Sequence, residues 1–191
     1  MSVKKIAILF SGEGSNLENL IKKLHKKDFN DFTVEVALAI TNNPNANGIK
    51  RALKFGINPI IIDHRDFKTR EEFDKRVVLE INKRGCVLSV LAGFMRILTP
   101  IFTQNIKALN IHPSILPLFK GANAIKRSFQ SDMKVAGVTV HTVTDELDGG
   151  EILAQECFNK EGMDFASFEE KIHKIEHEIY PKTVIDFLKT L

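Results

Sequence analysis

The stretch IAILFSGEGSNLENLIKKL at residues 6–24 joins an apolar run to a glycine-rich loop and then to an amphipathic segment. The run Ile6–Phe10 is apolar at every position, which is typical of a strand buried between two helical layers of a parallel sheet. The apolar positions after the loop keep the spacing of a helix that packs on such a sheet: Leu17, Leu20, Ile21 and Leu24. The stretch therefore predicts a βα unit.

The same order of apolar run, turn and amphipathic segment repeats over the first two-thirds of the chain. Further strands are predicted at Val34–Ile40, Pro59–Ile62 and Val87–Leu91. The clearest helix is Arg70–Lys83, and Thr69 followed by Glu72 is typical of a capping box at its start. Alternating βα units predict an α/β fold with a parallel sheet.

The pattern changes after Leu91. Strands are predicted at Ala108–His112, just before Pro113, and at Val135–Val143, where side chains alternate. A long helix closes the chain on an apolar stripe made of Phe168, Ile172, Ile175 and Ile179. Pro181 lacks an N–H group, so it is expected to kink or interrupt this helix.

Length and composition predict one domain over residues 1–191, located in the cytoplasm. With 43% hydrophobic and 27% charged residues, 191 residues bury a core without disulfides or metals. Cys86 and Cys157 form no CxxC pair, which argues against a disulfide framework or zinc ribbon and favours a reducing compartment. No apolar stretch approaches the roughly 20 residues of a membrane helix, and no signal-peptide cleavage site is present.

The net charge of +3 is a weak basic bias. The one basic cluster, residues 22–27, has no aromatic stacking partner nearby and is expected at the solvated end of a helix. Nucleic acid and membrane are therefore not expected partners, and small molecules are. The oligomeric state stays open.

The glycine-rich loop 11–16 is a candidate phosphate site. A loop that opens a helix presents unpaired backbone N–H groups, and Ser15 and Asn16 add side-chain donors. Leu17 replaces the third glycine of a dinucleotide fingerprint, and no Gly-Lys-Ser/Thr follows as in a P-loop, so a single phosphomonoester is favoured. The alternative is a plain tight turn.

A second candidate site lies on the strand Ala108–His112. Asn110 and His112 point to the same face because strand side chains alternate, and His112 ends its strand at the edge where α/β sheets bind ligands. Asp148 is the carboxylate expected to reach His112, since Gly149 and Gly150 let its loop fold back. Amide, imidazole and carboxylate together suit attack on a carbonyl carbon. The alternatives are a turn histidine beside a structural asparagine, and a solvated acidic turn.

His173, Glu176 and His177 match the H-x-x-E-H string of zinc peptidases. Helical geometry places both histidines away from the apolar stripe, so they are expected in solvent, and only 14 residues follow to supply a third ligand. Glu176 lies nearer the edge of the stripe, where it can border a cleft. A zinc site is therefore not expected.

Four motifs together resemble one enzyme family. They are SGEGSNL at 11–17, LAGFMRIL at 91–98, NIHPS at 110–114 and DELDGG at 145–150. They are similar to the phosphoribosylglycinamide formyltransferases, and the likeness covers nearly the whole chain. The NIHPS motif with a later Asp-x-Gly is shared by the wider family of formyltetrahydrofolate-using enzymes, whereas the glycine-rich loop narrows the choice.

The resemblance implies both a fold and a reaction. The fold is a Rossmann-like, open, mostly parallel but mixed twisted sheet with helices on both faces. The N-terminal half would bind the phosphate, and the C-terminal half would carry the folate-binding and catalytic loops. The reaction is transfer of a formyl group, without a metal, from 10-formyltetrahydrofolate to the amine of glycinamide ribonucleotide in purine biosynthesis.

The resemblance also assigns site residues position by position. Gly14, Ser15 and Asn16 are implied to bind the phosphate of the acceptor, and Glu176 to contact its ribose. The implied catalytic residues are Asn110, His112 and Asp148. Folate contacts are implied at Arg70, Met95, Arg96, Ile97, Leu98 and Asn110, and in the loop Val143, Thr144, Asp145, Glu146, Leu147 and Asp148. Asn123 departs from the histidine more common in the family, and Glu13, inside an anion-binding loop, is expected to point to solvent.

Three other functions remain open on the sequence. A formyltetrahydrofolate hydrolase would carry an additional N-terminal regulatory domain, and methionyl-tRNA formyltransferase a C-terminal RNA-binding domain; neither is expected here. A non-catalytic phosphosugar-binding module would bind the ribonucleotide but release no tetrahydrofolate.

Overall fold

The computed structural model describes residues 2–191 and contains one eight-stranded sheet. Its strands are β1 (Ser2–Phe10), β2 (Lys27–Phe29), β3 (Phe32–Thr41), β4 (Ile60–Ile61), β5 (Leu88–Leu91), β6 (Ala108–His112), β7 (Val135–Thr142) and β8 (Ile152–Asn159). The order across the sheet is β2-β3-β1-β5-β6-β7-β8, and β4 pairs with the end of β3. Strands β1, β3, β4, β5 and β6 are parallel, whereas β2, β7 and β8 are antiparallel to their neighbours.

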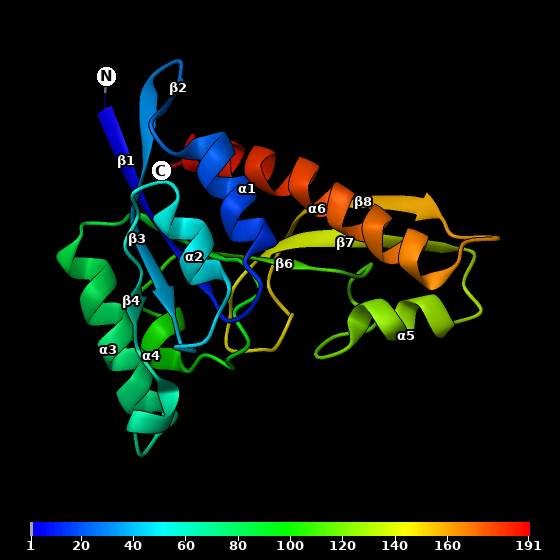
Figure 1. The fold of residues 1–191 in the computed structure, drawn as a ribbon, viewed down its shortest axis with the longest axis horizontal. Coiled ribbons are helices and arrows are strands. Elements are labelled where there is room, and N and C mark those ends of the chain that lie inside the picture. The colour runs from blue at the N-terminus through cyan, green and yellow to red at the C-terminus, as the bar shows by residue number, and fades with distance from the viewer. Residues whose placement is uncertain (1) are drawn as a thin grey trace.

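Helices cover both faces of this sheet (Figure 1). They are α1 (Ser15–Leu24), α2 (Gly48–Leu53), α3 (Arg70–Lys83), α4 (Pro100–Thr103), α5 (Ala124–Gln130) and α6 (Phe165–Leu188), with a short 3-10 turn η1 (His64–Asp66). Side chains of β1 alternate between two apolar clusters: Ile8 packs with α1 and α6, and Leu9 packs with α3 and α4. The predicted mixed α/β sheet is therefore confirmed.

The predicted elements agree with the structure where local signals are strong. Helix α3 has the predicted bounds, and the Thr69 hydroxyl accepts from the Glu72 amide at 3.2 Å, as an N-cap does. The Glu72 carboxylate bonds the Lys68 amide instead of that of Thr69, so the box is half formed. Strand β1 begins at Ser2, before the apolar run, because its polar start pairs with β3 from Phe32 onward.

The prediction for Pro181 was wrong in one respect: α6 runs over 24 residues without interruption. A proline at this position leaves the carbonyl of His177, four residues earlier, without its helical donor. The Asn19 side chain of α1 donates to that carbonyl at 2.9 Å. A neighbouring helix thus satisfies the group that the proline leaves free, and the helix continues.

Several loops lie together at one end of the parallel strands. The carboxyl ends of the parallel strands β1, β3, β5 and β6 lie there, and loops 11–14, 42–47, 92–99 and 113–123 follow them. Helix α6 packs on one face of β6 and β7, where Leu109, Ile111, Val138 and Val140 are buried. The opposite face of these two strands is covered by the β7–β8 loop, residues 143–151. No helix in residues 2–191 is long and apolar enough to cross a membrane.

Candidate active site

Four polar side chains converge on the face of β6 and β7 that α6 leaves free. The Asp148 carboxylate lies 3.5 Å from Nδ1 of His112 and 3.6 Å from Nε2 of His141. The Asn110 amide nitrogen lies 3.2 Å from the same Nε2 of His141. We call Asn110, His112, His141 and Asp148 the polar quartet. The structure therefore brings together the three residues predicted as catalytic and adds a fourth.

The loop that carries Asp148 turns back sharply, as its glycines predict. Asp148 has a φ of 50°, and a Cβ on Gly150 would lie 1.8 Å from the Thr142 carbonyl oxygen, so only glycine fits there. The Gly121 amide donates to the Asp148 carboxylate at 2.8 Å. These constraints hold Asp148, 9% exposed, against the two imidazoles.

Asp148 carries a charge at neutral pH. Burial alone would raise its pKa, but the hydrogen bond to His141, the bond from the Gly121 amide and the nearby imidazoles together lower the pKa below its ordinary value of 3.8. A buried carboxylate held ionised between two imidazoles is suited to orient them and to exchange protons with them.

His112 is held between two oxygens. Its Nε2 lies 3.0 Å from the Phe119 carbonyl oxygen, and a carbonyl only accepts, so this nitrogen carries a proton. Its Nδ1 faces Asp148. The ring therefore lies between the Phe119 carbonyl and the Asp148 carboxylate. The loop that supplies the Phe119 carbonyl is fixed from β7, where the Thr139 hydroxyl bonds the Ser114 carbonyl and the Leu116 amide.

His141 is the member of the quartet that sequence reasoning missed. It pairs with Asn110 across the antiparallel β6–β7 ladder, so both side chains point to the same face. Its Nδ1 donates to the Thr142 carbonyl at 2.8 Å, which leaves Nε2 to face Asn110 and Asp148. The only sequence signal was the alternation of β7, which does not reveal which strand lies beside it.

The glycine-rich loop opens α1 as predicted. Gly14 occupies the N-cap position with a φ of 75° and no side-chain cap bond, so the first N–H groups of α1 have no partner in the helix. The Asn16 amide oxygen is buried and lacks a partner within residues 2–191. Glu13 points outward, where its carboxylate accepts from Asn47 at 2.9 Å. This arrangement can hold an anion.

Gly14→Ala is expected to damage this loop selectively. The added Cβ would lie 2.6 Å from the Gly48 Cα, at a positive φ, so we expect a loss of about 1–3 kcal/mol in unfolding free energy. We also expect a KM for the phosphorylated acceptor raised about tenfold, because displaced N–H groups no longer converge. Urea unfolding and steady-state kinetics measure both effects. Gly12→Ala is the matched control, since a Cβ there meets nothing within 4 Å; equal damage in both variants would contradict the assignment.

Glu176 reaches this loop from the far end of the chain. Its carboxylate oxygen Oε2 accepts from the Asn16 amide at 3.1 Å, although 160 residues separate the two. The side chain is 5% exposed. Helix α6 packs beside α1 and thus brings Glu176 to the candidate phosphate loop.

The loop 92–99 lies next to the candidate phosphate loop and is hydrogen-bonded to it. The Ser11 hydroxyl accepts from the Met95 amide at 2.7 Å and donates to the Asn42 side chain. Met95 and Ile97 are 76% and 52% exposed. Leu98 is buried in the core, so only its backbone is free for a ligand. The Arg96 guanidinium lies over the Phe73 ring, and its Nε is buried without a partner within residues 2–191.

The β7–β8 loop closes over the site through contacts of its acidic side chains. Asp145 accepts from Thr103, and Glu146 pairs with Lys120 at 2.6 Å. Leu147 is exposed, whereas Val143 packs against the core cluster under α3 and α4. The Thr144 hydroxyl contacts the Glu146 carbonyl. Leu147 is therefore the exposed large apolar side chain of this loop.

Arg70 and Asn123 are not brought to the quartet by any bond. The Arg70 side chain is exposed at the start of α3 and makes no hydrogen bond or ion pair within residues 2–191. Asn123 is exposed at the N-cap of α5 with a φ of 58°, a conformation that asparagine tolerates. The folate contact of Arg70 stays a prediction.

The expectation that His173 and His177 point to solvent was wrong for His177. Its Nε2 is buried, because α6 packs against α1 on that side as well as against the sheet. His173 is 43% exposed and bonds Glu176. In residues 2–191, no three His, Cys, Asp or Glu side chains are arranged to hold a metal ion.

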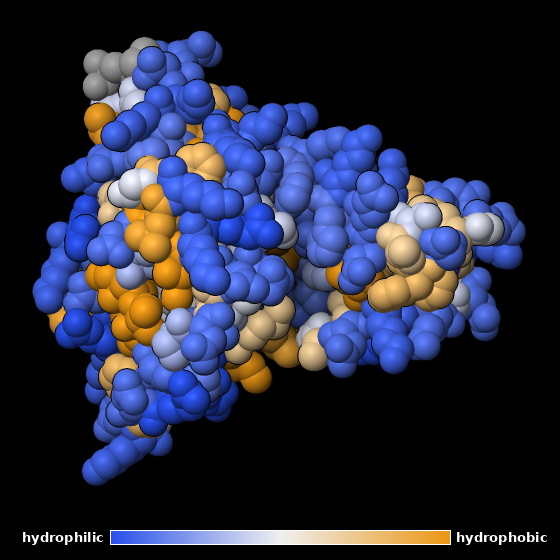
Figure 2. Space-filling model, in the orientation of Figure 1, coloured by the Kyte–Doolittle hydropathy of each residue, from blue (hydrophilic) through white to orange (hydrophobic). Residues whose placement is uncertain are grey.

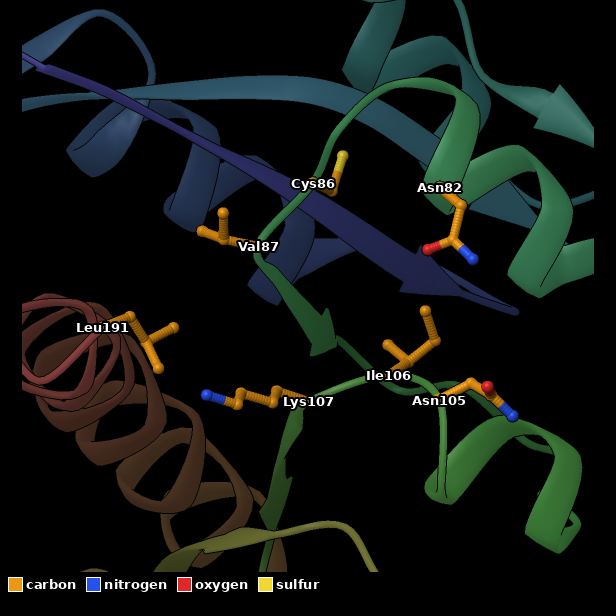
Figure 3. Close-up of a pocket in the computed structure, with 7 residues that line it drawn as sticks. All are labelled: Asn82, Cys86, Val87, Asn105, Ile106, Lys107 and Leu191. Carbon is orange, nitrogen blue, oxygen red and sulfur yellow. The ribbon is translucent and has the colours of Figure 1, made fainter.

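A pocket of about 350 Å³ lies at the opposite edge of the sheet (Figure 3). It is lined from the end of α3, the residues just before β5 and β6, and Leu191. Cys86 lines it, and burial raises the pKa of this thiol to about 11, so it is not a thiolate at neutral pH. The residues predicted as catalytic do not line this pocket.

The molecular surface is hollowed near the loops that carry the quartet. Figure 2 shows the molecule hollowed between its larger part and the part that carries α5, where Figure 1 places the loops of the quartet. Leu53 of α2, Ile61 of β4 and Leu79 of α3 are also exposed apolar side chains.

Comparison with known proteins identifies the family. Residues 4–184 match the formyl transferase family. The chain is 33% identical to the phosphoribosylglycinamide formyltransferase of Bacillus subtilis over 97% of this chain and 95% of that protein. It is 40% identical to the trifunctional purine biosynthetic protein adenosine-3 of Gallus gallus, over 93% of this chain, and it spans 18% of that protein's length.

The solved structures agree. The crystal structure of phosphoribosylglycinamide formyltransferase from Campylobacter jejuni superposes with a TM-score of 0.96, at 59% identity over 97% of this chain and 98% of that one. The protein from Bacillus halodurans superposes with a TM-score of 0.87 at 33% identity. The family match, the identities over nearly full length and these superpositions all place the chain in the formyl transferase family, among the phosphoribosylglycinamide formyltransferases.

Proposed function

We propose that this protein transfers the formyl group of 10-formyltetrahydrofolate to the amine of glycinamide ribonucleotide, giving N-formylglycinamide ribonucleotide and tetrahydrofolate. The observation that carries the proposal is the polar quartet, which lies at an edge of the sheet shared by an anion-binding loop and the loop 92–99. Glycinamide ribonucleotide has one phosphomonoester and one amine, which suits an anion site next to acyl-transfer chemistry.

The quartet supplies the groups that direct formyl transfer needs. The amine nitrogen attacks the formyl carbon, and negative charge develops on the formyl oxygen, which the Asn110 amide and the His112 imidazolium stabilise as donors. In the structure the Phe119 carbonyl accepts a hydrogen bond from Nε2 of His112. The formyl oxygen must therefore take the place of that carbonyl when the substrates bind.

Protons balance within the quartet. The amine loses one proton as the adduct forms, and Asp148 is the base that takes it. The bond from the formyl carbon to the folate nitrogen then breaks, and that nitrogen takes a proton from His112. Passage of the proton from Asp148 to His112, which lie 3.5 Å apart, restores both groups. His141 orients Asn110 and Asp148 through its Nε2.

The donor side fits a folate. We assign it to Met95, Arg96, Ile97, Leu98, Asn110 and the loop from Val143 to Asp148, with Arg70 at its outer end. Exposed Met95, Ile97 and Leu147 offer apolar surface for an aromatic ring system, and the unpartnered Arg96 Nε offers a donor for its acidic end. On the acceptor side, Gly14, Ser15 and Asn16 bind the phosphate, and Glu176 binds a ribose hydroxyl.

We also propose that residues 1–191 act as one domain, with the acceptor bound by the N-terminal half and the folate by the C-terminal loops. The single continuous sheet, which contains strands from both halves, supports one domain. The free thiols of Cys86 and Cys157 support a reducing compartment such as the cytoplasm.

A transfer assay tests the proposal. The protein is incubated with 10-formyltetrahydrofolate and, in separate reactions, glycinamide ribonucleotide, water alone or charged initiator tRNA. Tetrahydrofolate is expected to form rapidly only with glycinamide ribonucleotide. Rapid release in water alone would identify a hydrolase, release with tRNA another formyltransferase, and binding of the ribonucleotide without any release a non-catalytic module.

A further inference from the structure

Glu176 is a buried carboxylate without a lysine or arginine partner. Its side chain is 5% exposed, and its Oε2 accepts from the Asn16 amide at 3.1 Å and from Nδ1 of His173 at 2.9 Å. No protein donor within residues 2–191 bonds its other oxygen, Oε1. The first oxygen is therefore fixed by two donors, and the second is free to accept from a sugar hydroxyl.

This carboxylate stands beside a loop that binds an anion. Of the other carboxylates near the loop, Glu13 turns outward to Asn47, and Glu18 is paired with Lys22 at 2.7 Å and with Arg51. Glu176 is thus the carboxylate whose charge is not offset by a fixed cation. A phosphate dianion close to it is repelled unless a positive charge compensates.

We propose that His173 is a positioning and charge-compensating residue of the acceptor site, whose imidazolium fixes Glu176 and makes this corner neutral for the phosphosugar. The proposal rests on the proposed function, because glycinamide ribonucleotide is the anion considered. It also explains why the H-x-x-E-H string forms no metal site: one histidine serves the carboxylate, and the other, His177, is packed against α1.

The protonated state of His173 is favoured by its surroundings. The hydrogen bond that His173 donates to Glu176 raises the pKa of His173 above its ordinary value of 6.5 more than burial lowers it. The charges that act on His173 are those of Glu176 and Glu169, both on α6. From α1 and α2, Glu18 is paired with both Lys22 and Arg51, so these three side chains together carry a net charge of +1 and none of them pairs with His173. No charged side chain of α5, β6, β7 or β8 in the described chain forms an ion pair with α6.

Experiments can distinguish the hydrogen bond between His173 and Glu176 from the positive charge of His173. Neutral imidazole still donates through Nδ1, so raising the pH keeps the hydrogen bond but removes the positive charge. In His173→Asn the amide nitrogen stands where Nδ1 was, which keeps a donor and removes the charge at every pH. In His173→Leu both are lost.

Calorimetric binding of glycinamide ribonucleotide between pH 6.5 and 9 tests the charge. The ratio of Kd in His173→Asn to Kd in the wild type cancels titration of the ligand itself. We expect a ratio of about three to ten at pH 6.5 that falls to about one as the pH rises through the pKa of His173. The same ligand without its phosphate is expected to show a ratio of about one throughout, and His173→Leu to bind more weakly than His173→Asn at pH 9.

NMR titration of the imidazole gives a readout apart from binding strength and activity. By linkage, a site whose proton favours the ligand binds that proton more tightly when the ligand is bound. We therefore expect glycinamide ribonucleotide to raise the pKa of His173 and Glu176→Gln to lower it. A Kd ratio that does not change with pH, in a wild-type protein that transfers formyl groups normally, would overturn the role of His173 alone. A wild-type protein that neither binds nor formylates glycinamide ribonucleotide would overturn the proposed function with it.

Discussion

Replacing Asp148 by asparagine is expected to lower kcat for formyl transfer about 10²- to 10³-fold with little change in fold. Asparagine tolerates the φ of 50° at this position, and its amide oxygen can still accept from the Gly121 amide. What it lacks is the negative charge that faces both imidazoles and the ability to take the amine proton. The loss should therefore appear in kcat, while KM for each substrate changes less.

Single-turnover kinetics measure the rate of formyl transfer, and thermal unfolding measures the stability of the fold. Because the pKa of Asp148 in the folded protein is below its ordinary value, the ionised carboxylate stabilises the fold at neutral pH, and this contribution is lost as the pH falls below about 3.8. The difference in Tm between wild type and Asp148→Asn should shrink in acid. Wild-type turnover in Asp148→Asn at pH 7 would show that the carboxylate has no part in the chemistry. Asp186→Asn, at an exposed position near the end of α6, is the control for loss of one acid.

His112→Gln is expected to lower kcat by a similar factor of about 10²–10³. Glutamine can place an amide nitrogen near the position of Nε2, so it keeps a neutral donor toward the formyl oxygen. It cannot carry a proton between Asp148 and the leaving folate nitrogen. A large loss in this variant therefore reports proton transfer and the imidazolium charge, since a single donor is retained.

The double variant His112→Gln/Asp148→Asn tests whether the two residues act as a unit. Because each depends on the other, 3.5 Å away, the double variant is expected to lose little more than either single variant. Rapid-quench measurement of product formation gives the three rates. Losses that multiply would mean that His112 and Asp148 act independently, against the proton path proposed for the quartet.

The sequence predicted the positions of local features well because their signals lie within a few residues. The alternation of Ala108–His112 placed Asn110 and His112 on one face, and the structure shows the same strand bounds. Gly149 and Gly150 predicted the return of the loop that carries Asp148. The roles assigned to these residues came from resemblance, and kinetics must test them.

Other features could not be predicted because their partners are distant in the chain. His141 joins Asn110 only through the antiparallel register of β6 and β7, across 31 residues. Helix α6 passes Pro181 without interruption because Asn19, on another helix, donates to the free carbonyl. The pairing of Glu176 with Asn16 depends on how α6 packs on α1.

By itself, the sequence determined the α/β class, the strand–loop–helix that opens α1 and the three polar residues of the candidate centre. These follow from side-chain periodicity and from the backbone freedom of glycine, which act over single turns and strands. The tertiary structure alone decided that His141 lies beside Asn110 and Asp148 and that Nε2 of His112 bonds the Phe119 carbonyl. It also decided that the Glu176 carboxylate of α6 meets the Asn16 amide of α1. Such contacts depend on strand register and helix packing, which are set by the burial of the whole core rather than by any local pattern.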